Sequence, residues 1–313
     1  MRAKQVFSKR PDPLFPALDY LIQLQRPAAT LRLKQGYPRA LMAGGHLSRF
    51  QGRGVEFDEV RAYQPGDDIR SMDWRVTART GKPHTKLFRE ERERPALLLL
   101  DMRAPMFFAT RGALKAVIAA ECAALLAWSV MHQGDRVGSM LIGAVDEQSP
   151  ALIRPSRGKR AVMRLLGNIV NHPQWQQHSA EQGASLLASL QQASHAARTG
   201  SLLMIVSDGR GLDEACALLL KQLLKHHNIV FVMVYDAFEA DMQNVGLLQA
   251  SDGVNIKQAD SANAAVRKQH ADRFSSRREA LRQLDLLPGF FLIECATTDD
   301  PHAALQARLG ISR

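Results

Sequence analysis

From residue 95 onward, short apolar runs alternate with longer segments of helical character, and this alternation constrains the fold more than any other feature of the chain. The runs 96–100 and 201–206 are continuously apolar, which is typical of strands buried on both faces of a sheet. Helical segments follow them, over 112–132 and 212–226. Buried strands that alternate with helices predict an α/β fold, an open and mostly parallel sheet with helices on both faces.

The same pattern predicts the other elements of this α/β body, which we take to span residues 95–313. Further strands are expected over 136–142, 151–154, 229–235 and 290–295, the second of them antiparallel to the first. Further helices are expected over 158–171, 181–197 and 262–284, and from residue 301 onward. These elements together predict one large domain.

The segment 113–131 is apolar enough to raise the question of a membrane span. It carries Lys115 and Glu121, and each charge would cost about 2.5–3.5 kcal/mol at the centre of a bilayer. We therefore expect a buried core helix and no transmembrane segment. No apolar run follows the first charged residues, so we expect no secretory signal and a cytoplasmic location. Three widely spaced cysteines fit reduced core thiols, at positions Cys122, Cys216 and Cys295.

Positive charge is concentrated at the start of the chain. The whole sequence has 41 Lys and Arg against 31 Asp and Glu, which gives a net charge of +10. Residues 1–49 hold nine of these cations and two Asp, so +7 of the excess lies there. We interpret residues 1–49 as a basic N-terminal arm, with a short helix over 17–25 whose apolar residues dock on the body or on a partner. Such an arm fits an acidic partner: nucleic acid, an anionic membrane surface or an acidic protein.

Two predicted strands end in acidic residues, Asp101 and Asp208. In open parallel sheets the carboxyl ends of the strands form the ligand-binding edge, so a site is expected where these side chains meet. Hard cations such as Mg²⁺ prefer oxygen ligands that come from several loops. The sequence has no phosphate-binding P-loop, no H-E-x-x-H and no G-x-S-x-G motif, and we therefore expect no enzyme.

The strand-end pattern resembles a von Willebrand factor type A domain. In that family a D-x-S-x-S motif and a later Asp hold a divalent metal. Here the motif reads DMRAP, so Asp101 and Asp208 match, whereas Arg103 and Pro105 occupy the serine positions. Neither replacement offers a lone pair to a metal, but a guanidinium pairs well with carboxylates. We therefore predict a degenerate, metal-free site without a cofactor, in which Arg103 lies between Asp101 and Asp208; the alternative is that Arg103 points into solvent.

Residues 50–94 form a charged segment that resembles the signature of the domain of unknown function 58 family. Residues 54–74 read GVEFDEVRAYQPGDDIRSMDW, against a family pattern of roughly G-x-E-F-x-x-x-R-x-Y-x-P-G-D-D-x-R-x-I-D-W. The signature residues considered for a role are Glu56, Asp58, Arg61, Tyr63, Pro65, Gly66, Asp67, Asp68, Arg70, Asp73 and Trp74. The resemblance implies a bacterial protein of the short soluble branch, with a von Willebrand-like half. It also implies a gene commonly found beside that of a MoxR-type AAA+ ATPase.

The signature segment has two interpretations. Its charges alternate in sign, which suits an internal ion-pair network, and Tyr63 and Trp74 are suited to anchor it. The segment then packs on the body as a structural clasp. Alternatively it is a partner-binding face. Pro65-Gly66-Asp67-Asp68 is predicted to be a turn in which the Asp side chains accept from backbone amides.

The leading function is a non-enzymatic adaptor that acts with a MoxR-type AAA+ ATPase in the assembly or maturation of protein complexes. The alternative is a nucleic-acid-binding protein that uses the basic N-terminal third, but its cations are not interleaved with aromatic residues. The cations considered for that role beyond the arm are Arg75, Arg79, Lys82, Lys86 and Arg89. A hydrolase that uses Asp67, Asp68 and Asp73 is a third hypothesis. The sequence makes no prediction of the oligomeric state.

Overall fold

A computed structural model describes residues 10–33, 55–65, 67–90, 95–143, 152–177, 185–251 and 256–310 of the chain. The chain divides into two compact units, which are described separately. The larger one, the α/β unit, comprises Met1–Tyr37 and Arg94–Arg313. The smaller one, the signature unit, comprises Pro38–Glu93 and so begins earlier than the charged segment expected from the sequence.

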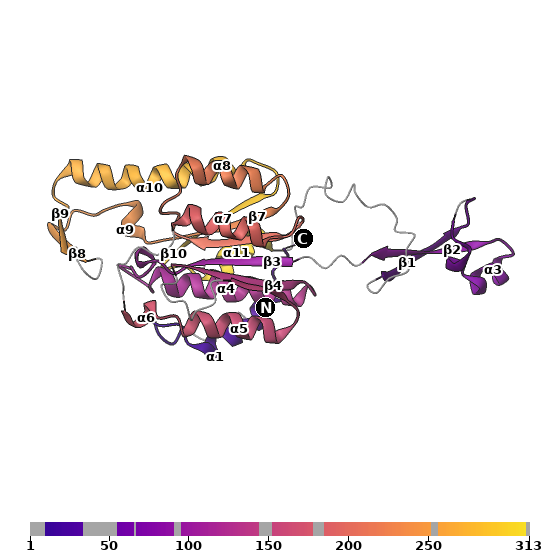
Figure 1. The fold of residues 1–313 in the computed structure, drawn as a ribbon. Helices are drawn as coiled ribbons and strands as arrows, with labels where there is room; N and C mark the ends of the chain where they lie inside the picture. Colours follow the sequence, from indigo (N-terminus) through magenta and orange to yellow (C-terminus); the bar gives the residue numbers. More distant parts are fainter. Residues whose placement is uncertain are drawn as a thin grey trace, which may run out of the picture. The chain divides into compact units, whose positions relative to one another are not determined.

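A six-stranded sheet forms the centre of the α/β unit (Figure 1). Its strands are β3 (Pro95–Asp101), β4 (Arg136–Ile142), β5 (Leu152–Ser156), β6 (Leu202–Ser207), β7 (Asn228–Tyr235) and β10 (Phe290–Ala296). They lie in the order β10-β7-β6-β3-β4-β5, and all neighbours are parallel except β5, which is antiparallel to β4. The predicted fold class is confirmed, and the antiparallel strand lies at the edge of the sheet.

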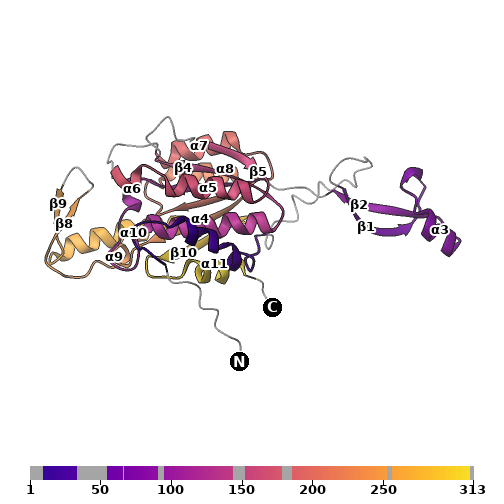
Figure 2. The ribbon, with the colours of Figure 1, turned by 90° about the horizontal axis from the view of Figure 1, so that it is seen from below.

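Alternate residues of each central strand enter two separate cores. In β3, Leu97 and Leu99 pack with the helices α7 (Leu186–Ala196), α8 (Glu214–Leu223) and α10 (Ala264–Asp285). Leu98 and Leu100 pack on the opposite face, with α4 (Lys115–His132), α5 (Lys159–Val170) and α11 (Pro301–Leu309). Figure 2 shows the second layer from below. Because successive strand residues point to opposite faces, a continuously apolar strand such as β3 requires helices on both sides.

Shorter elements complete the α/β unit. They are η3 (Ala104–Met106), α6 (Gln174–Gln177), α9 (Ala237–Ala240) and the hairpin of β8 (Leu247–Ser251) with β9 (Ile256–Asp260). The sequence analysis did not predict the β8–β9 hairpin.

Helix α4 is the apolar segment that raised the question of a membrane span. Among the described residues it is the one helix that is long and apolar enough to cross a bilayer, and 89% of that stretch is buried inside the protein. The sheet, the helices α5 and α11 and the N-terminal segment pack around it, so it is a core helix. Its Glu121, only 2% exposed, pairs with Arg10 of the N-terminal segment.

The described part of the N-terminal segment packs on the α/β unit through α1 (Leu18–Gln23) and α2 (Gln25–Ala28). Leu21 and Leu31 are fully buried in the core beside α4. The indole of Trp128 donates a hydrogen bond to the Leu21 carbonyl at 3.0 Å. Residues 10–33 are therefore an integral part of this unit, and the rest of the expected basic arm, residues 1–9 and 34–49, lies outside the described residues.

The signature unit is a two-stranded hairpin with short helices in its connection. Strand β1 (Val55–Ala62) pairs antiparallel with β2 (His84–Glu90). Between them lie η2 (Ile69–Ser71) and α3 (Trp74–Thr80), and α3 ends at Gly81 with a φ of 69°. That this unit packs on the sheet domain stays a prediction.

Candidate functional site

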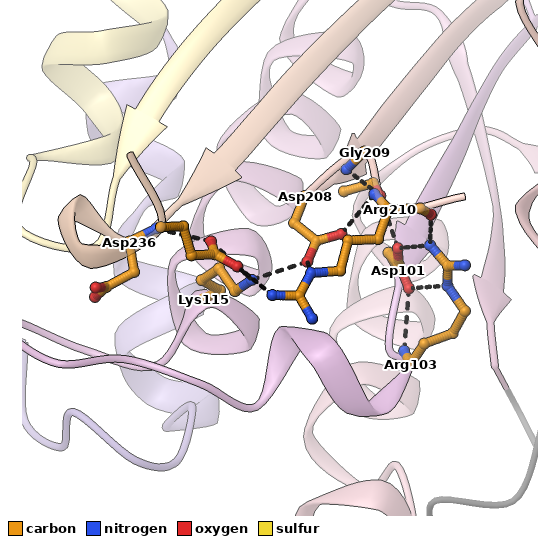
Figure 3. A network of polar contacts seen from close by, with 9 residues as sticks. Asp101, Arg103, Lys115, Asp208, Gly209, Arg210 and Asp236 are labelled. Atoms are coloured by element: carbon orange, nitrogen blue, oxygen red, sulfur yellow. Dashed lines mark hydrogen bonds and ion pairs between the residues drawn. The ribbon is translucent and has the colours of Figure 1, made fainter. Parts of the chain in front are cut away.

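The expected site lies at the carboxyl edge of the sheet, where the chain order of the strands reverses. Strand β3 lies between β4 and β6, and it is followed in sequence by β4 on one side and later by β6 on the other. Such a switch point is where ligands of open α/β sheets bind. Asp101 ends β3 and Asp208 follows β6, so both sequence-predicted carboxylates lie at this edge (Figure 3).

Asp101 is held by four hydrogen bonds from two residues and is fully buried. Its Oδ1 accepts from the backbone N of Arg103 at 3.0 Å and from Nε of the same residue at 2.9 Å. Its Oδ2 accepts from Nη2 of Arg103 at 2.6 Å and from the Ser207 hydroxyl at 2.7 Å. Burial acts to lower the pKa of Arg103, but its hydrogen bonds and ion pair with Asp101 outweigh that effect and raise the pKa.

The side chain of Arg103 packs closely against the backbone of a neighbouring loop. Gly143, with a φ of 89°, lies so close that an added Cβ would be 2.8 Å from Cγ of Arg103. The Nη2 of Arg103 also donates to the Arg210 carbonyl at 2.8 Å. The arginine therefore occupies a fitted position between two loops, rather than pointing into solvent.

Asp208 has a different cation, Lys115, at the start of α4. The Nζ of Lys115 is fully buried, 2.8 Å from Oδ2 of Asp208 and 2.9 and 3.0 Å from the two Oε atoms of Glu239 (Figure 3). Arg210 closes the cluster from the solvent side, with Nη2 2.7 Å from Oε1 of Glu239 and Nε 3.4 Å from Oδ2 of Asp208. Burial acts to raise the pKa of Asp208, but the charges of Lys115 and Arg210 outweigh it and lower the pKa to about 2.

A further carboxylate, Asp236, follows β7 at the same edge and is also fully buried. It accepts from the backbone N and the hydroxyl of Thr110 at 2.9 and 2.6 Å, from the Phe238 backbone N at 2.9 Å and from the Thr297 hydroxyl at 2.8 Å. Burial acts to raise its pKa, but these hydrogen bonds outweigh it and lower the pKa.

The structure corrects the expected bridge between the two strand-end carboxylates in one respect. Arg103 pairs with Asp101, whereas Lys115 and Arg210 neutralise Asp208. The reason is distance along the chain, because Arg103 is two residues from Asp101 and its side chain folds back over that carboxylate. Within the described ranges, no cluster of three His, Cys, Asp or Glu side chains is arranged to hold a metal ion. A divalent ion therefore does not fit this donor set, since ammonium and guanidinium groups occupy the carboxylates.

The aspartates of the signature unit cap local backbone. Asp67 accepts from the Gln64 backbone N at 2.9 Å and pairs with Arg61 at 2.8 Å, which forms the predicted turn. Asp68 caps η2 through the Arg70 backbone N at 2.9 Å. The ion-pair network expected here is thus partly replaced by capping.

Asp73 extends this capping pattern and supports α3. It accepts from the backbone N atoms of Arg75 and Val76 at 3.0 and 3.1 Å, and it lies 3.9 Å from Nζ of Lys86. The side chains of Glu56 and Asp58 on β1, and Gly66, lie outside the described residues.

The signature unit also exposes two large apolar side chains. Trp74 is 65% and Ile69 is 63% exposed, and the arginines Arg70, Arg75 and Arg79 around them are exposed as well. The expected anchor Trp74 therefore does not bury its ring within this unit, and Tyr63 is only half-buried.

Sequence reasoning missed Lys115, Glu239 and Arg210 as members of the site. The sequence contains a recognisable pattern for two of them, Lys115 and Glu239. Lys115 is a lysine in an apolar helix, which requires a carboxylate partner. Asp236 and Glu239 form an Asp-x-x-Glu capping box directly after a predicted strand, the same strand-end pattern that identified Asp101.

Comparison with known proteins shows the family to which the chain belongs. A family model described as "Protein of unknown function DUF58" matches residues 59–280, and the chain belongs to this family. The uncharacterized proteins Mb1516 of Mycobacterium bovis and Rv1480 of Mycobacterium tuberculosis are each 30% identical to it over 218 residues. The match covers 68% of this chain and 66% of each relative, so the chain spans slightly less than two thirds of their length.

Two solved structures are similar at low identity. A von Willebrand factor type A protein from Catenulispora acidiphila matches with 10% identity and a TM-score of 0.36, over 82% of this chain and 50% of that protein. An uncharacterized membrane spanning protein from Vibrio fischeri matches with 12% identity and a TM-score of 0.25, over 68% of this chain and 95% of that protein. Both TM-scores are below 0.5, so the fold class rests on the sheet order and the two helix layers described above.

Proposed function

We propose that the chain is a non-enzymatic interaction module in which the carboxylates of the sheet edge serve the fold. The observation that carries this proposal is that each of these carboxylates is already paired inside the chain. Asp101 has Arg103, Asp208 and Glu239 share Lys115, and the oxygens of Asp236 accept from hydroxyls and backbone. The proposal includes the absence of a resident metal ion and a cytoplasmic location.

The electrostatics of the site support a role without catalysis. A general base works best when its pKa lies near the working pH. Asp208 has a pKa of about 2, because Lys115 and Arg210 stabilise its charged form against burial. Such a carboxylate is a weak base at neutral pH and is shielded from a reacting group by its own cations.

The signature unit supplies the surface for recognition in this proposal. Trp and Arg are the residue types most enriched among the energetically dominant positions of protein interfaces. Trp74 and Ile69 are each more than 60% exposed, with Arg70 and Arg75 beside them in sequence. These features support the interpretation of the segment as a partner-binding face.

The partner we propose is a MoxR-type AAA+ ATPase, in the assembly or maturation of protein complexes. This part rests on the family resemblance and not on a residue of this chain. The test is co-purification from the native cell, with and without ATP, of wild type, Trp74→Ala and Leu286→Ala. Leu286 is a matched control because it is 76% exposed on the α/β unit.

We expect the ATPase to accompany wild type and Leu286→Ala and to decrease about tenfold or more with Trp74→Ala. Recovery that is equal with all three chains would contradict the assigned face. Recovery of nucleic acid in place of any ATPase would contradict the adaptor function.

A second candidate, binding of single-stranded nucleic acid, is favoured by the exposed cations beside Trp74. Arg75, Arg79 and Lys82 are exposed in the same short helix and the turn after it, and an aromatic ring among cations is the arrangement that stacks bases. Retention on a DNA column distinguishes the two functions. Tight binding at about 150 mM salt supports nucleic acid, whereas elution below it supports the adaptor.

A further inference from the structure

One face of α10 turns His270 and Arg277 toward the sheet-edge cluster. Burial lowers the pKa of His270, so of these two side chains Arg277 carries the charge at neutral pH. His270, Phe274, Arg277 and Leu281 recur at intervals of four, three and four residues, so they share one side of the helix. Phe274 and Leu281 are 3% and 0% exposed in the core beneath α10. Leu281 also lies against Gly209, the residue after Asp208, where an added Cβ would be 3.6 Å from its Cδ1. His270 and Arg277 are therefore on the side of α10 that faces the loop after β6.

Arg277 has no carboxylate partner among the described residues. Its Nε atom is buried, and no acceptor in the described chain forms a hydrogen bond with it. Its guanidinium lies 5.8 Å from the ring of Phe274, one turn earlier on the same helix. The neighbouring Arg278 differs, because it pairs with Glu294. Burial lowers the pKa of Arg277, and the charges of Asp208, Arg210 and Glu239 are close enough to affect it as well.

Two more nitrogen-bearing groups near Arg277 have unused donor or acceptor atoms. The Nε of Arg210 makes no hydrogen bond within the described chain, although it lies 3.4 Å from Oδ2 of Asp208 and Nη2 of the same residue pairs with Glu239. The Nε2 of His270 is likewise buried without a partner in the described chain, and its ring lies 5.8 Å from that of Phe238 on α9. Leaving a buried donor unsatisfied is costly, so the Nε–H of Arg277 is the candidate for an external ligand, with the half-exposed Arg210 beside it.

The charges of the cluster do not balance. Asp208 and Glu239 carry two negative charges, whereas Lys115, Arg210 and Arg277 carry three positive ones. Asp236 is not among the charges that act on Arg277, and its oxygens accept from Thr110, Thr297 and the backbone of α9. Within the part of the chain that the structure describes, one positive charge, that of Arg277, has no carboxylate paired with it.

We propose that Arg277, with Arg210, forms an anion site that binds one carboxylate group of a protein partner. A single carboxylate carries the one negative charge that the cluster lacks, and its two oxygens match the paired donors of a guanidinium. Arg210 is 40% exposed, so a group that approaches from solvent reaches it first. This inference rests on the proposed function of the chain as an interaction module, and it assigns an acidic side chain or a chain terminus to the partner.

The test measures binding of a fluorescently labelled hexaglutamate peptide by anisotropy at about 150 mM salt, where non-specific attraction is largely screened. The chains compared are wild type, Arg277→Gln and Arg273→Gln. Arg273 is the matched control because it lies on the same helix, is exposed, and loses the same charge. We expect Arg277→Gln to weaken binding about tenfold or more and Arg273→Gln to change it by less than about twofold. Equal losses in both variants would show general attraction to a basic surface and overturn the site.

Competition with inorganic phosphate shows whether the site prefers a carboxylate or a phosphate group. At equal ionic strength we expect it to displace the peptide no better than sodium chloride does. Displacement by phosphate at much lower concentration would overturn the carboxylate assignment.

A stability measurement separates binding from folding. Arg277→Gln removes a half-buried charge that has no partner, so its melting temperature without peptide should equal or exceed that of wild type. A decrease would show that Arg277 is structural and would overturn the inference. Co-purification of the ATPase keeps the two proposals distinct. Undiminished peptide binding by Arg277→Gln, with the ATPase recovered by wild type and lost with Trp74→Ala, contradicts the anion site alone.

Discussion

Replacement of Lys115 by Met is the sharpest test of how the sheet-edge cluster is held. The ammonium group is fully buried, with three carboxylate oxygens within 2.8–3.0 Å, and its partners Asp208 and Glu239 are 1% and 2% exposed. Methionine keeps the length of the side chain but leaves Arg210 as the one described cation that still pairs directly with these two carboxylates. Arg210 is 40% exposed, so solvent weakens its contribution.

The expected loss follows from the burial of the pair. Removal of one partner of a buried ion pair costs about 3–5 kcal/mol, because the other charge is left uncompensated. For a domain of this size each kcal/mol lowers the melting temperature by roughly 2–4 °C, so Lys115→Met should melt roughly 6–20 °C below wild type.

The loss should depend on pH with a defined sign. In wild type the pKa of Asp208 is lowered to about 2, so its contribution to stability is present above about pH 4 and is lost as the pH falls toward 2. Without Lys115 burial dominates and raises that pKa, and protonation then relieves the buried charge. The difference in unfolding free energy between variant and wild type should therefore be smaller at pH 5 than at pH 8.

Urea unfolding at both pH values measures these differences, with Lys159→Met as the matched control. Lys159 is also the first residue of its helix, α5, but it is exposed. Its replacement should change the unfolding free energy by less than about 0.5 kcal/mol. A loss below about 1 kcal/mol for Lys115→Met, or one that grows on acidification, would refute the reasoning.

Three further predictions address other parts of the chain. Burial lowers the pKa of His172 to about 4, so stability should fall by up to about 3 kcal/mol as the pH drops from 6.5 to 4, and His172→Gln should flatten that slope in urea unfolding. Gly143→Ala should cost about 1–3 kcal/mol by the same assay, since its φ is 89° and the new Cβ meets Arg103; an unchanged midpoint would show that Arg103 is free to move. Asp73→Ala removes the cap of α3 and should cost about 0.5–2 kcal/mol, seen as faster amide exchange of Val76; unaltered exchange would contradict the capping role.

The sheet was predictable from sequence because its central strands are apolar on both faces. Leu97–Leu100 of β3 have no polar alternation, and this requires cover on both sides. The capping aspartates of the turn after Pro65 were predictable for a similar reason, since Asx turns depend on local sequence. The β8–β9 hairpin was not predictable, because its strands lack a clear apolar alternation.

The site was only half predictable, because its parts converge from distant elements. The pairing of Asp101 with Arg103 is local and follows from the DMRAP motif. Lys115 comes from α4 and Glu239 from α9, 124 positions apart, and no local pattern states that they meet at Asp208. A search for the partners of a lysine inside an apolar helix would have pointed to the strand-end carboxylates.

Cations of the chain itself pair with the carboxylates at the edge where a divalent ion would otherwise bind. Isothermal titration of the purified chain with Mg²⁺ and with Mn²⁺ tests this most directly. We expect no binding of micromolar strength and an unchanged melting temperature on addition of either ion. Micromolar binding that disappears in Asp101→Ala would contradict it.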